Sequence, residues 1–153
     1  MVLTDVDGVL TDGGMYYSQN GESFKKFNTR DGMAVELLKN NGISTIYVTK
    51  ENSNSSRKRA QKTNASIYEG IVDKKSLVLK IIKKHKISND NLAYIGDDVN
   101  DLELLKMVGL SGAPSNAIES VKQTVNYVCK SSGGNGAFRE IADLIIKSKS
   151  NYI

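Results

Sequence analysis

The chain opens with MVLTDVDGVLTDG, residues 1–13, and this stretch carries the strongest indication of the fold. Residues 1–6 are apolar enough for a buried strand, which ends in a turn that contains Asp5, Asp7 and Gly8. Ligands of parallel α/β sheets bind beyond the carboxyl ends of the strands. An acidic turn at that position therefore predicts that the functional site begins at Asp5.

Further along the chain, short apolar runs alternate with segments of helical periodicity. Strands are expected at 43–49, 66–70, 92–96, 108–112 and 125–129. Helices are expected from Asp31 (as the cap) to Gly42, at 52–63, from Asp73 onward, around 102–109, at 115–123 and after Gly136 to Ile146. This alternation is typical of a three-layer, Rossmann-like α/β domain with a parallel sheet.

A β-hairpin is expected between the first strand and the first helix. Asn20-Gly21 favours a tight turn between the apolar segments 15–17 and 23–27. Only about fifteen residues surround this hairpin, whereas a small independent domain needs about 50 or more. The sequence thus predicts a hairpin flap and no cap domain, within one domain that spans residues 1–153.

The composition excludes several classes of protein. The 153 residues include 21 Lys+Arg and 17 Asp+Glu, for a net charge of +4. A single cysteine excludes an intrachain disulfide framework, and no apolar run approaches the roughly 20 residues of a membrane span. The basic blocks 57–59 and 83–86 lack interleaved aromatics, so we expect no nucleic-acid partner. Because nothing at the start resembles a signal peptide, a cytoplasmic location is expected.

Acidic side chains follow two of the expected strands. Asp5 follows the first strand, and an acidic run at 96–101 follows a later one. These carboxylates would repel one another unless a cation lay among them, and oxygen ligands without His or Cys favour Mg²⁺. We expect Asp5 and Asp97 to bind the metal and Lys74 to face Asp5 or a ligand oxygen. Such a set suits phosphoryl transfer, in which charge on the phosphoryl oxygens must be stabilised.

The position of each carboxylate suggests its chemistry. A metal-bound Asp5 stays ionised and can attack phosphorus, which forms an aspartyl-phosphate. Asp7 can protonate the leaving oxygen and later activate water, while its backbone carbonyl reaches the metal. Gly8 permits a sharp turn, so that the amides of the residues after it can bind the phosphate.

Four motifs resemble those of the haloacid dehalogenase superfamily of phosphatases. Residues 5–13 are similar to its first motif, Thr49 to its second, Lys74 to its third and residues 96–101 to its fourth. Their order and spacing match across nearly the whole chain.

The resemblance implies a role for each motif residue. It implies four catalytic residues, with Asp5 as nucleophile, Asp7 as general acid and base, and Thr49 and Lys74 on the phosphate. It implies Asp97 as a metal ligand, and Asp98 and Asp101 as residues that hold the metal shell and Lys74. We also place Asp101, like Gly8, on the side of the substrate.

The branch of the superfamily is suggested by the missing cap. The chain is similar to the capless sugar-acid phosphatases, which act on 3-deoxy-octulosonate 8-phosphate or on nonulosonate (sialic-acid type) 9-phosphates, and segments 24–28, 30–32, 70–74 and 133–140 carry this likeness. The last segment also resembles the carboxyl-terminal domain of animal acylneuraminate cytidylyltransferases. These relatives imply a homotetramer in which the hairpin and the glycine-rich tail complete a neighbour's site. The apolar side chains expected on the hairpin favour such pairing.

Few side chains distinguish the two substrates. The octulosonate branch typically has Thr-Gly-Arg after the second strand, whereas this chain has Thr49-Lys50-Glu51. Glu51 resembles the nonulosonate branch, where it can accept hydrogen bonds from a sugar hydroxyl or amide, and Lys50 fits neither branch. We therefore predict a small anionic nonulosonate 9-phosphate as substrate, with Lys50 and Glu51 against it and Arg57 on its carboxylate. Octulosonate 8-phosphate is the alternative, which segment 30–32 favours.

Two other classes of protein remain open. A signalling receiver domain also places acidic residues, a hydroxyl and a lysine around Mg²⁺, but its phosphorylated aspartate normally follows the third strand. The second is a non-catalytic oligomerisation domain of a cytidylyltransferase. Only four residues precede Asp5, fewer than a strand usually has, and this favours a domain excerpt of such a larger chain. Hydrolysis of a sugar-acid phosphate would exclude both.

Overall fold

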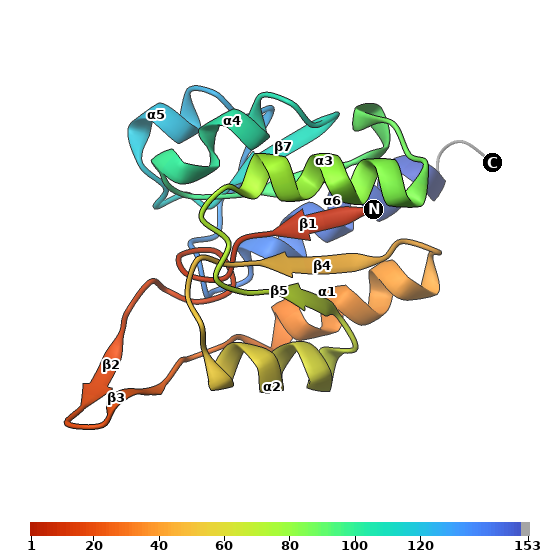
Figure 1. The fold of residues 1–153 in the computed structure, drawn as a ribbon. Coiled ribbons are helices and arrows are strands. Elements are labelled where there is room, and N and C mark those ends of the chain that lie inside the picture. The colour runs from red at the N-terminus through yellow and green to blue at the C-terminus, as the bar shows by residue number, and fades with distance from the viewer. Residues whose placement is uncertain (151–153) are drawn as a thin grey trace.

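A six-stranded parallel sheet forms the centre of the computed structural model, which describes residues 1–150 (Figure 1). Its strand order is β5-β4-β1-β6-β7-β8. The bounds of the strands are Val2–Thr4 for β1, Thr45–Val48 for β4, Ser66–Tyr68 for β5, Ala93–Ile95 for β6, Leu110–Ala113 for β7 and Tyr127–Val128 for β8. Strand β1 lies between β4 and β6, so the strand order reverses beside β1 and the ends of β1 and β6 are neighbours.

Helices cover both faces of the sheet, which confirms the predicted three-layer α/β architecture (Figure 1). One face carries α1 (Thr29–Asn40), α2 (Asn54–Thr63) and α6 (Ala137–Ser150). The other carries α3 (Lys74–His85), α4 (Leu102–Leu105) and α5 (Glu119–Lys122), and the 3₁₀ turns η1 (Asn89–Asn91) and η2 (Val99–Asp101) complete the loops around β6.

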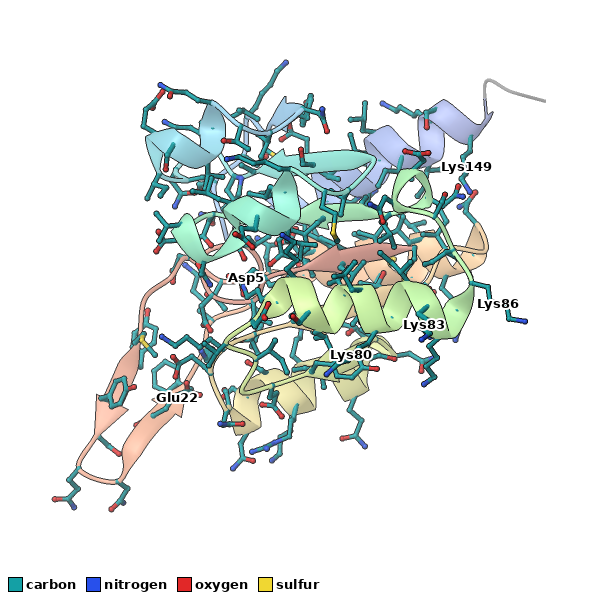
Figure 2. All side chains as sticks on the ribbon, turned by 45° about the horizontal axis from the view of Figure 1, so that its top comes forward. Asp5, Glu22, Lys80, Lys83, Lys86 and Lys149 are labelled. Atoms are coloured by element: carbon teal, nitrogen blue, oxygen red, sulfur yellow. The ribbon has the colours of Figure 1, made fainter. Side chains whose placement is uncertain are left out.

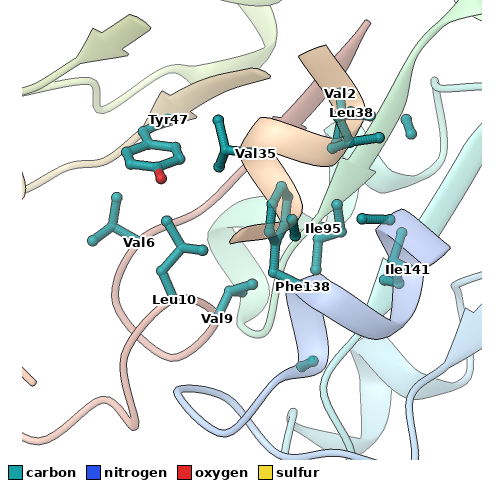
Figure 3. Packing of buried hydrophobic residues seen from close by; sticks show 14 of the residues in the cluster. Val2, Val6, Val9, Leu10, Val35, Leu38, Tyr47, Ile95, Phe138 and Ile141 are labelled. Atoms are coloured by element: carbon teal, nitrogen blue, oxygen red, sulfur yellow. The ribbon is translucent and has the colours of Figure 1, made fainter. Parts of the chain in front are cut away.

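Each face of the sheet has its own hydrophobic cluster. On the α1 and α6 side, Val35, Leu38, Phe138 and Ile141 pack onto the sheet and onto the loop after β1 (Figure 3). On the other side, side chains of α3 and α4 pack against the opposite face of the same strands. Because both faces are covered, the central strands β1, β4 and β6 are buried throughout, and the carboxyl ends of the parallel strands converge at one edge.

The predicted hairpin is present and points away from the sheet (Figure 1). Strand β2 (Tyr16–Ser18) pairs antiparallel with β3 (Gly21–Phe24). The second strand ends at Phe24, because Phe27 already packs against the core and under the guanidinium of Arg59. No separate domain is inserted between β1 and α1 among the described residues. The extent of the domain over 1–153 stays a prediction.

Two of the predicted helix features are wrong. Asn28, not Asp31, caps α1, because the Asn28 side chain accepts from the backbone of Arg30 at 2.8 Å. Asp31 is buried and accepts instead from the amides of Gly136 and Arg139, so that it caps α6 across the molecule. The helix expected at 115–123 is reduced to the single turn of α5.

Within the part of the chain that the structure describes, no helix is both long enough and apolar enough to span a bilayer.

Candidate active site

The predicted acidic site forms at the carboxyl ends of β1 and β6. The amide of Asp5 donates to Ile95 at 2.9 Å, which continues the pairing of β1 with β6 and brings Asp5 beside Asp97. A cavity of about 170 Å³ opens here, lined by Asp5, Asp7, Thr49, Lys50, Glu51, Asp97, Asp98 and Asn100. The structure therefore brings together most of the residues that the sequence analysis selected.

Lys74 lies inside a cage of buried polar groups. Its ammonium is 3.0 Å from Asp5 Oδ1, 2.7 Å from Asp101 Oδ1 and 3.2 Å from the Tyr94 hydroxyl. The cap residue Asp73 starts α3 immediately before Lys74, so the position of the lysine is set by the beginning of a helix. Lys74 contacts Asp5 directly, as the sequence predicted.

Asp101 supports this cage and does not line the cavity. It is fully buried, and its Oδ1 accepts from Lys74 and from the Tyr94 hydroxyl at 2.6 Å. Its Oδ2 accepts from the backbone of Asp97 at 3.1 Å. The assignment of Asp101 to the substrate side is wrong, because no solvent-facing oxygen remains on it. It holds Lys74 and the loop of Asp97 in place.

Burial and like charges shift the pKa values of the two facing carboxylates. Burial raises the pKa of Asp5 and outweighs the opposing effect of Lys74. Burial, together with Asp5 and Asp101, raises the pKa of Asp97 to about 7. Burial alone would lower the pKa of Lys74, but Asp5 and Asp101 raise it, so the lysine is charged. The site therefore holds more carboxylate than its lysine can neutralise.

A hard divalent cation fits this excess of carboxylate. Carboxylate oxygens of Asp5, Asp97 and Asp101 lie within 4.8 Å of one another, and Asp97 Oδ1 is buried with no hydrogen-bond partner. Because Asp101 is committed to Lys74, the oxygens left for a metal belong to Asp5 and Asp97. An all-oxygen set with few protein ligands is the one that Mg²⁺ prefers. Metal binding through the Asp7 carbonyl stays a prediction.

Asp7 lies at the mouth of the cavity, between a threonine and a lysine. The Thr49 hydroxyl is 3.4 Å from Asp7 Oδ2, and the ammonium of Lys25 forms an ion pair with Asp7 Oδ1. The sequence analysis missed Lys25, because the Lys25-Lys26 pair after β3 does not reveal which side chain turns inward. Only Lys26 stays at the surface, where it pairs with Asp12.

The turn around Gly8 has the expected shape but not the expected free amides. Gly8 has a φ of +92°, and a side chain there would overlap the Asp97 carboxylate. The Gly8 amide donates to the Thr11 hydroxyl, and the amides of residues 9–11 donate to the Val6 carbonyl. The prediction that these amides bind phosphate is therefore wrong. The amides of Asp7 and Lys50, two residues of the cavity lining, have no such acceptor among the described residues.

Lys50 and Glu51 line the cavity, whereas Arg57 does not. Both are exposed, and the Glu51 amide donates to the Thr49 hydroxyl at 3.1 Å. The Arg57 guanidinium pairs with Glu69 at 3.3 Å and with Asn54 at 2.8 Å on α2. This intramolecular pairing explains why Arg57 is outside the predicted substrate site.

The glycine-rich segment 133–136 supports the acidic turn from within the same chain. The Gly134 amide donates to the Val9 carbonyl at 2.9 Å. A side chain on Gly133 would overlap the Gly8 carbonyl, and one on Gly134 would press on residues 11–12. Glycine is thus required here because two backbones lie in direct contact.

Comparisons with known proteins agree with this geometry. The haloacid dehalogenase-like hydrolase family matches residues 36–141. The chain is 36% identical over 149 residues to the 3-deoxy-D-manno-octulosonate 8-phosphate phosphatase of Haemophilus influenzae, covering 97% of this chain and 83% of that protein. It is 33% identical over 147 residues to the enzyme of the same name from Escherichia coli K12, covering 95% and 78%.

Solved structures give the same result. The cobalt-bound form of the Haemophilus influenzae phosphatase superposes with a TM-score of 0.94 at 35% identity, covering 97% of this chain and 88% of that one. The Moraxella catarrhalis 3-deoxy-D-manno-octulosonate 8-phosphate phosphatase, in complex with magnesium, phosphate and KDO, also superposes with a TM-score of 0.94, at 34% identity. The match covers 99% of this chain and 87% of that one.

Proposed function

The chain belongs to the haloacid dehalogenase-like hydrolases, as a phosphatase of their capless sugar-acid branch, and from that membership we propose that it hydrolyses 3-deoxy-D-manno-octulosonate 8-phosphate with Mg²⁺ as its cofactor. The observation that carries this proposal is the acidic cavity with its charged lysine, in a chain that matches an octulosonate phosphatase over 97% of its length. The preference for a nonulosonate that Glu51 suggested has no counterpart among these relatives.

We assign the chemistry to the residues at the two strand ends. The Asp5 carboxylate attacks phosphorus, the bond from phosphorus to the sugar oxygen breaks, and Asp7 delivers a proton to that oxygen. A water then attacks the aspartyl-phosphate and gives its proton to Asp7. The bond from Asp5 to phosphorus breaks, which releases phosphate, restores the Asp5 carboxylate and leaves Asp7 protonated for the next cycle.

The other residues bind and orient. Lys74 neutralises charge at the phosphoryl group from its place against Asp5, Thr49 hydrogen-bonds the phosphoryl oxygens, and the amides of Asp7 and Lys50 supply two further donors. Asp5 and Asp97 would hold Mg²⁺, which supplies a positive charge against the oxygens of the transferring phosphoryl group. The chain itself places nucleophile and proton donor two residues apart in the turn after β1.

A nonulosonate 9-phosphate is the second candidate substrate, and Glu51 is the observation in its favour. This carboxylate is exposed in the cavity lining, next to Lys50 in the sequence. There it can accept a hydrogen bond from a hydroxyl or amide of a longer sugar acid.

The two substrates are separated by phosphate release with Mg²⁺ at matched concentrations. We expect higher kcat/KM for octulosonate 8-phosphate. A clear preference for the nine-carbon substrate would replace the proposed substrate by the second candidate and make Glu51 the selecting residue. Hydrolysis of neither would favour the non-catalytic oligomerisation domain.

The nucleophile is tested separately with Asp5→Asn. The amide has nearly the same shape as the carboxylate but cannot attack phosphorus, so turnover is abolished while the circular dichroism spectrum is retained. Turnover of this variant near the wild-type rate would contradict the mechanism.

We also propose that the protein forms a homotetramer through the hairpin. Met15, Tyr16, Tyr17 and Phe24 are 40–64% exposed, and the rings of Tyr16 and Phe24 stack on each other at 4.5 Å. An isolated two-stranded ribbon with this much exposed apolar surface favours a partner. Small-angle scattering is expected to give the mass of four chains, and a monomer mass would contradict this assembly.

A further inference from the structure

Lys25 is a buried cation that the proposed mechanism does not use. It follows β3 at the base of the hairpin, and its side chain is 1% exposed. Its ammonium pairs with Asp7 Oδ1 and lies 3.3 Å from Glu22 Oε2. A buried ammonium is retained only where partners compensate its desolvation, and both of its partners are carboxylates. One of these is the residue to which we assign proton transfer.

The ion pair divides the two oxygens of Asp7 between different tasks. Oδ1 pairs with the ammonium of Lys25, which does not line the cavity, whereas Oδ2 accepts from the hydroxyl of Thr49, which does. A carboxylate that is held through one oxygen cannot exchange the two by rotation. Oδ2 is therefore the oxygen that is presented to the substrate.

We propose that Lys25 is a positioning residue which fixes Asp7 so that Oδ2 carries the proton in both steps of the reaction. The inference rests on the proposed function, since it needs Asp7 as the general acid and base. Its physical basis is orientation: a proton donor that moves by about 1 Å can lose a rate factor of about 100.

A second set of contacts holds Lys25. Glu22 Oε1 accepts from the Ser53 hydroxyl at 2.5 Å, and Ser53 is the cap of α2. The Ser53 amide in turn donates to Glu69 at 2.8 Å. Glu22 and Asp5 lie at the same end of the molecule, away from Lys83, Lys86 and Lys149 (Figure 2). Through Glu22 and Lys25, the placement of the hairpin controls the orientation of Asp7.

The test compares Lys25→Met with wild type on two phosphates of different leaving group. Methionine keeps the unbranched shape but removes the charge. With octulosonate 8-phosphate, whose leaving oxygen needs a proton, kcat is expected to fall about 100-fold, with KM changed by less than about threefold. In p-nitrophenyl phosphate the leaving nitrophenolate needs no proton, so Lys25→Met keeps the rate of the first step and slows only the attack of water on the aspartyl-phosphate. The first turnover is therefore expected to release a burst of nitrophenolate equal to the enzyme concentration.

The burst separates positioning from a general loss of structure. A misfolded fraction would lower burst amplitude and steady-state rate together, whereas a misplaced Asp7 leaves the amplitude intact. A reduced amplitude with an equal loss on both substrates, or a kcat close to wild type, would overturn the inference. Lys26→Met is the matched control, because Lys26 carries the same charge one residue on, at the surface, and its kcat is expected to be unchanged.

Glu22→Gln keeps the inference testable if Lys25→Met does not fold. It leaves the Lys25 to Asp7 pair intact but removes the charge that holds Lys25 from the other side. We expect a smaller loss of kcat with the same burst, and wild-type kinetics would overturn the part assigned to Glu22. Wild-type turnover of p-nitrophenyl phosphate without turnover of octulosonate 8-phosphate would overturn the proposed substrate alone. The burst assay would then still decide the role of Lys25.

Discussion

Asp101 has no contact with solvent, yet the active-site lysine depends on it. Its two oxygens accept from Lys74, from the Tyr94 hydroxyl and from the backbone of Asp97. Without the Asp101 carboxylate, Lys74 would keep only Asp5 as its charged partner, and it would draw that carboxylate away from phosphorus.

The substitution Asp101→Asn is expected to weaken both the fold and the site. Removing one charge from a buried ion pair lowers the free energy of unfolding by about 3–5 kcal/mol, measured by urea denaturation. The kcat falls as well, since Lys74 loses its anchor. Glu103→Gln, at an exposed pair with Lys75, serves as control and changes the free energy of unfolding by less than about 0.5 kcal/mol. Equal effects of the two substitutions would contradict the supporting role of Asp101.

At the scale of elements, two loops that are distant in the sequence form one unit. The acidic turn at 5–13 contacts the glycine-rich segment 133–136, and that segment is held by Asp31 of α1 through the amides at the start of α6. The position of the nucleophile therefore depends on the carboxyl-terminal helix as well as on β1.

Gly133→Ala is expected to displace the acidic turn. The new methyl group overlaps the Gly8 carbonyl, so the free energy of unfolding falls by about 1–3 kcal/mol and kcat falls with it. Gly42→Ala is the control: Gly42 has a φ of +73° after α1 but open space around it, so alanine costs about 1–3 kcal/mol of backbone strain without a change in kcat. Activity and stability are measured for both variants. A wild-type kcat for Gly133→Ala would show that the activity of the acidic turn does not depend on its contact with the glycine-rich segment.

On the scale of the whole molecule, charge is distributed unevenly. The carboxylates of the site lie at one end of the sheet, and Lys83, Lys86 and Lys149 lie toward the other (Figure 2). Lys83 and Lys84 lie in the last turn of α3, where positive charge is favourable next to the helix dipole. The chain therefore has a net charge of +4 but a local excess of negative charge at the site. A metal would offset this excess.

Mg²⁺ is therefore expected to stabilise the protein, and more so at higher pH. In the metal-free protein Asp97 keeps its proton up to a pKa of about 7, whereas in the unfolded chain it ionises near 3.8. The folded state thus binds more protons between these values, and its stability falls as pH rises through about 7. Mg²⁺ must displace those protons, so it binds better above pH 7.

Thermal unfolding measures this effect directly. At a Mg²⁺ concentration of about 100 times Kd, Tm is expected to rise by about 5–10 °C at pH 8 and by less at pH 5.5. In Asp97→Asn the increase is lost, because the remaining oxygens are too few. The same increase at both pH values, or in the variant, would argue against a metal at Asp97.

Much of the fold and part of the site were predictable from the sequence. The alternation of strands and helices, the hairpin at Asn20-Gly21 and the approach of Asp5 to Asp97 and Lys74 all follow from local patterns. Apolar periodicity and turn residues act over a few positions, and parallel sheets place every carboxyl end at one edge. These features needed no knowledge of distant contacts.

Tertiary structure decided the partners of the charged side chains. Asp31 caps a helix that begins more than 100 residues later, Arg57 pairs with Glu69, and Lys25 turns inward to Asp7 while Lys26 does not. A charge in a sequence reveals that it needs a partner or solvent but not which one it meets, because that choice depends on how the layers pack. The sequence by itself therefore determined the chemistry of the site, and the packing of the hairpin and α6 against β1 determined its geometry.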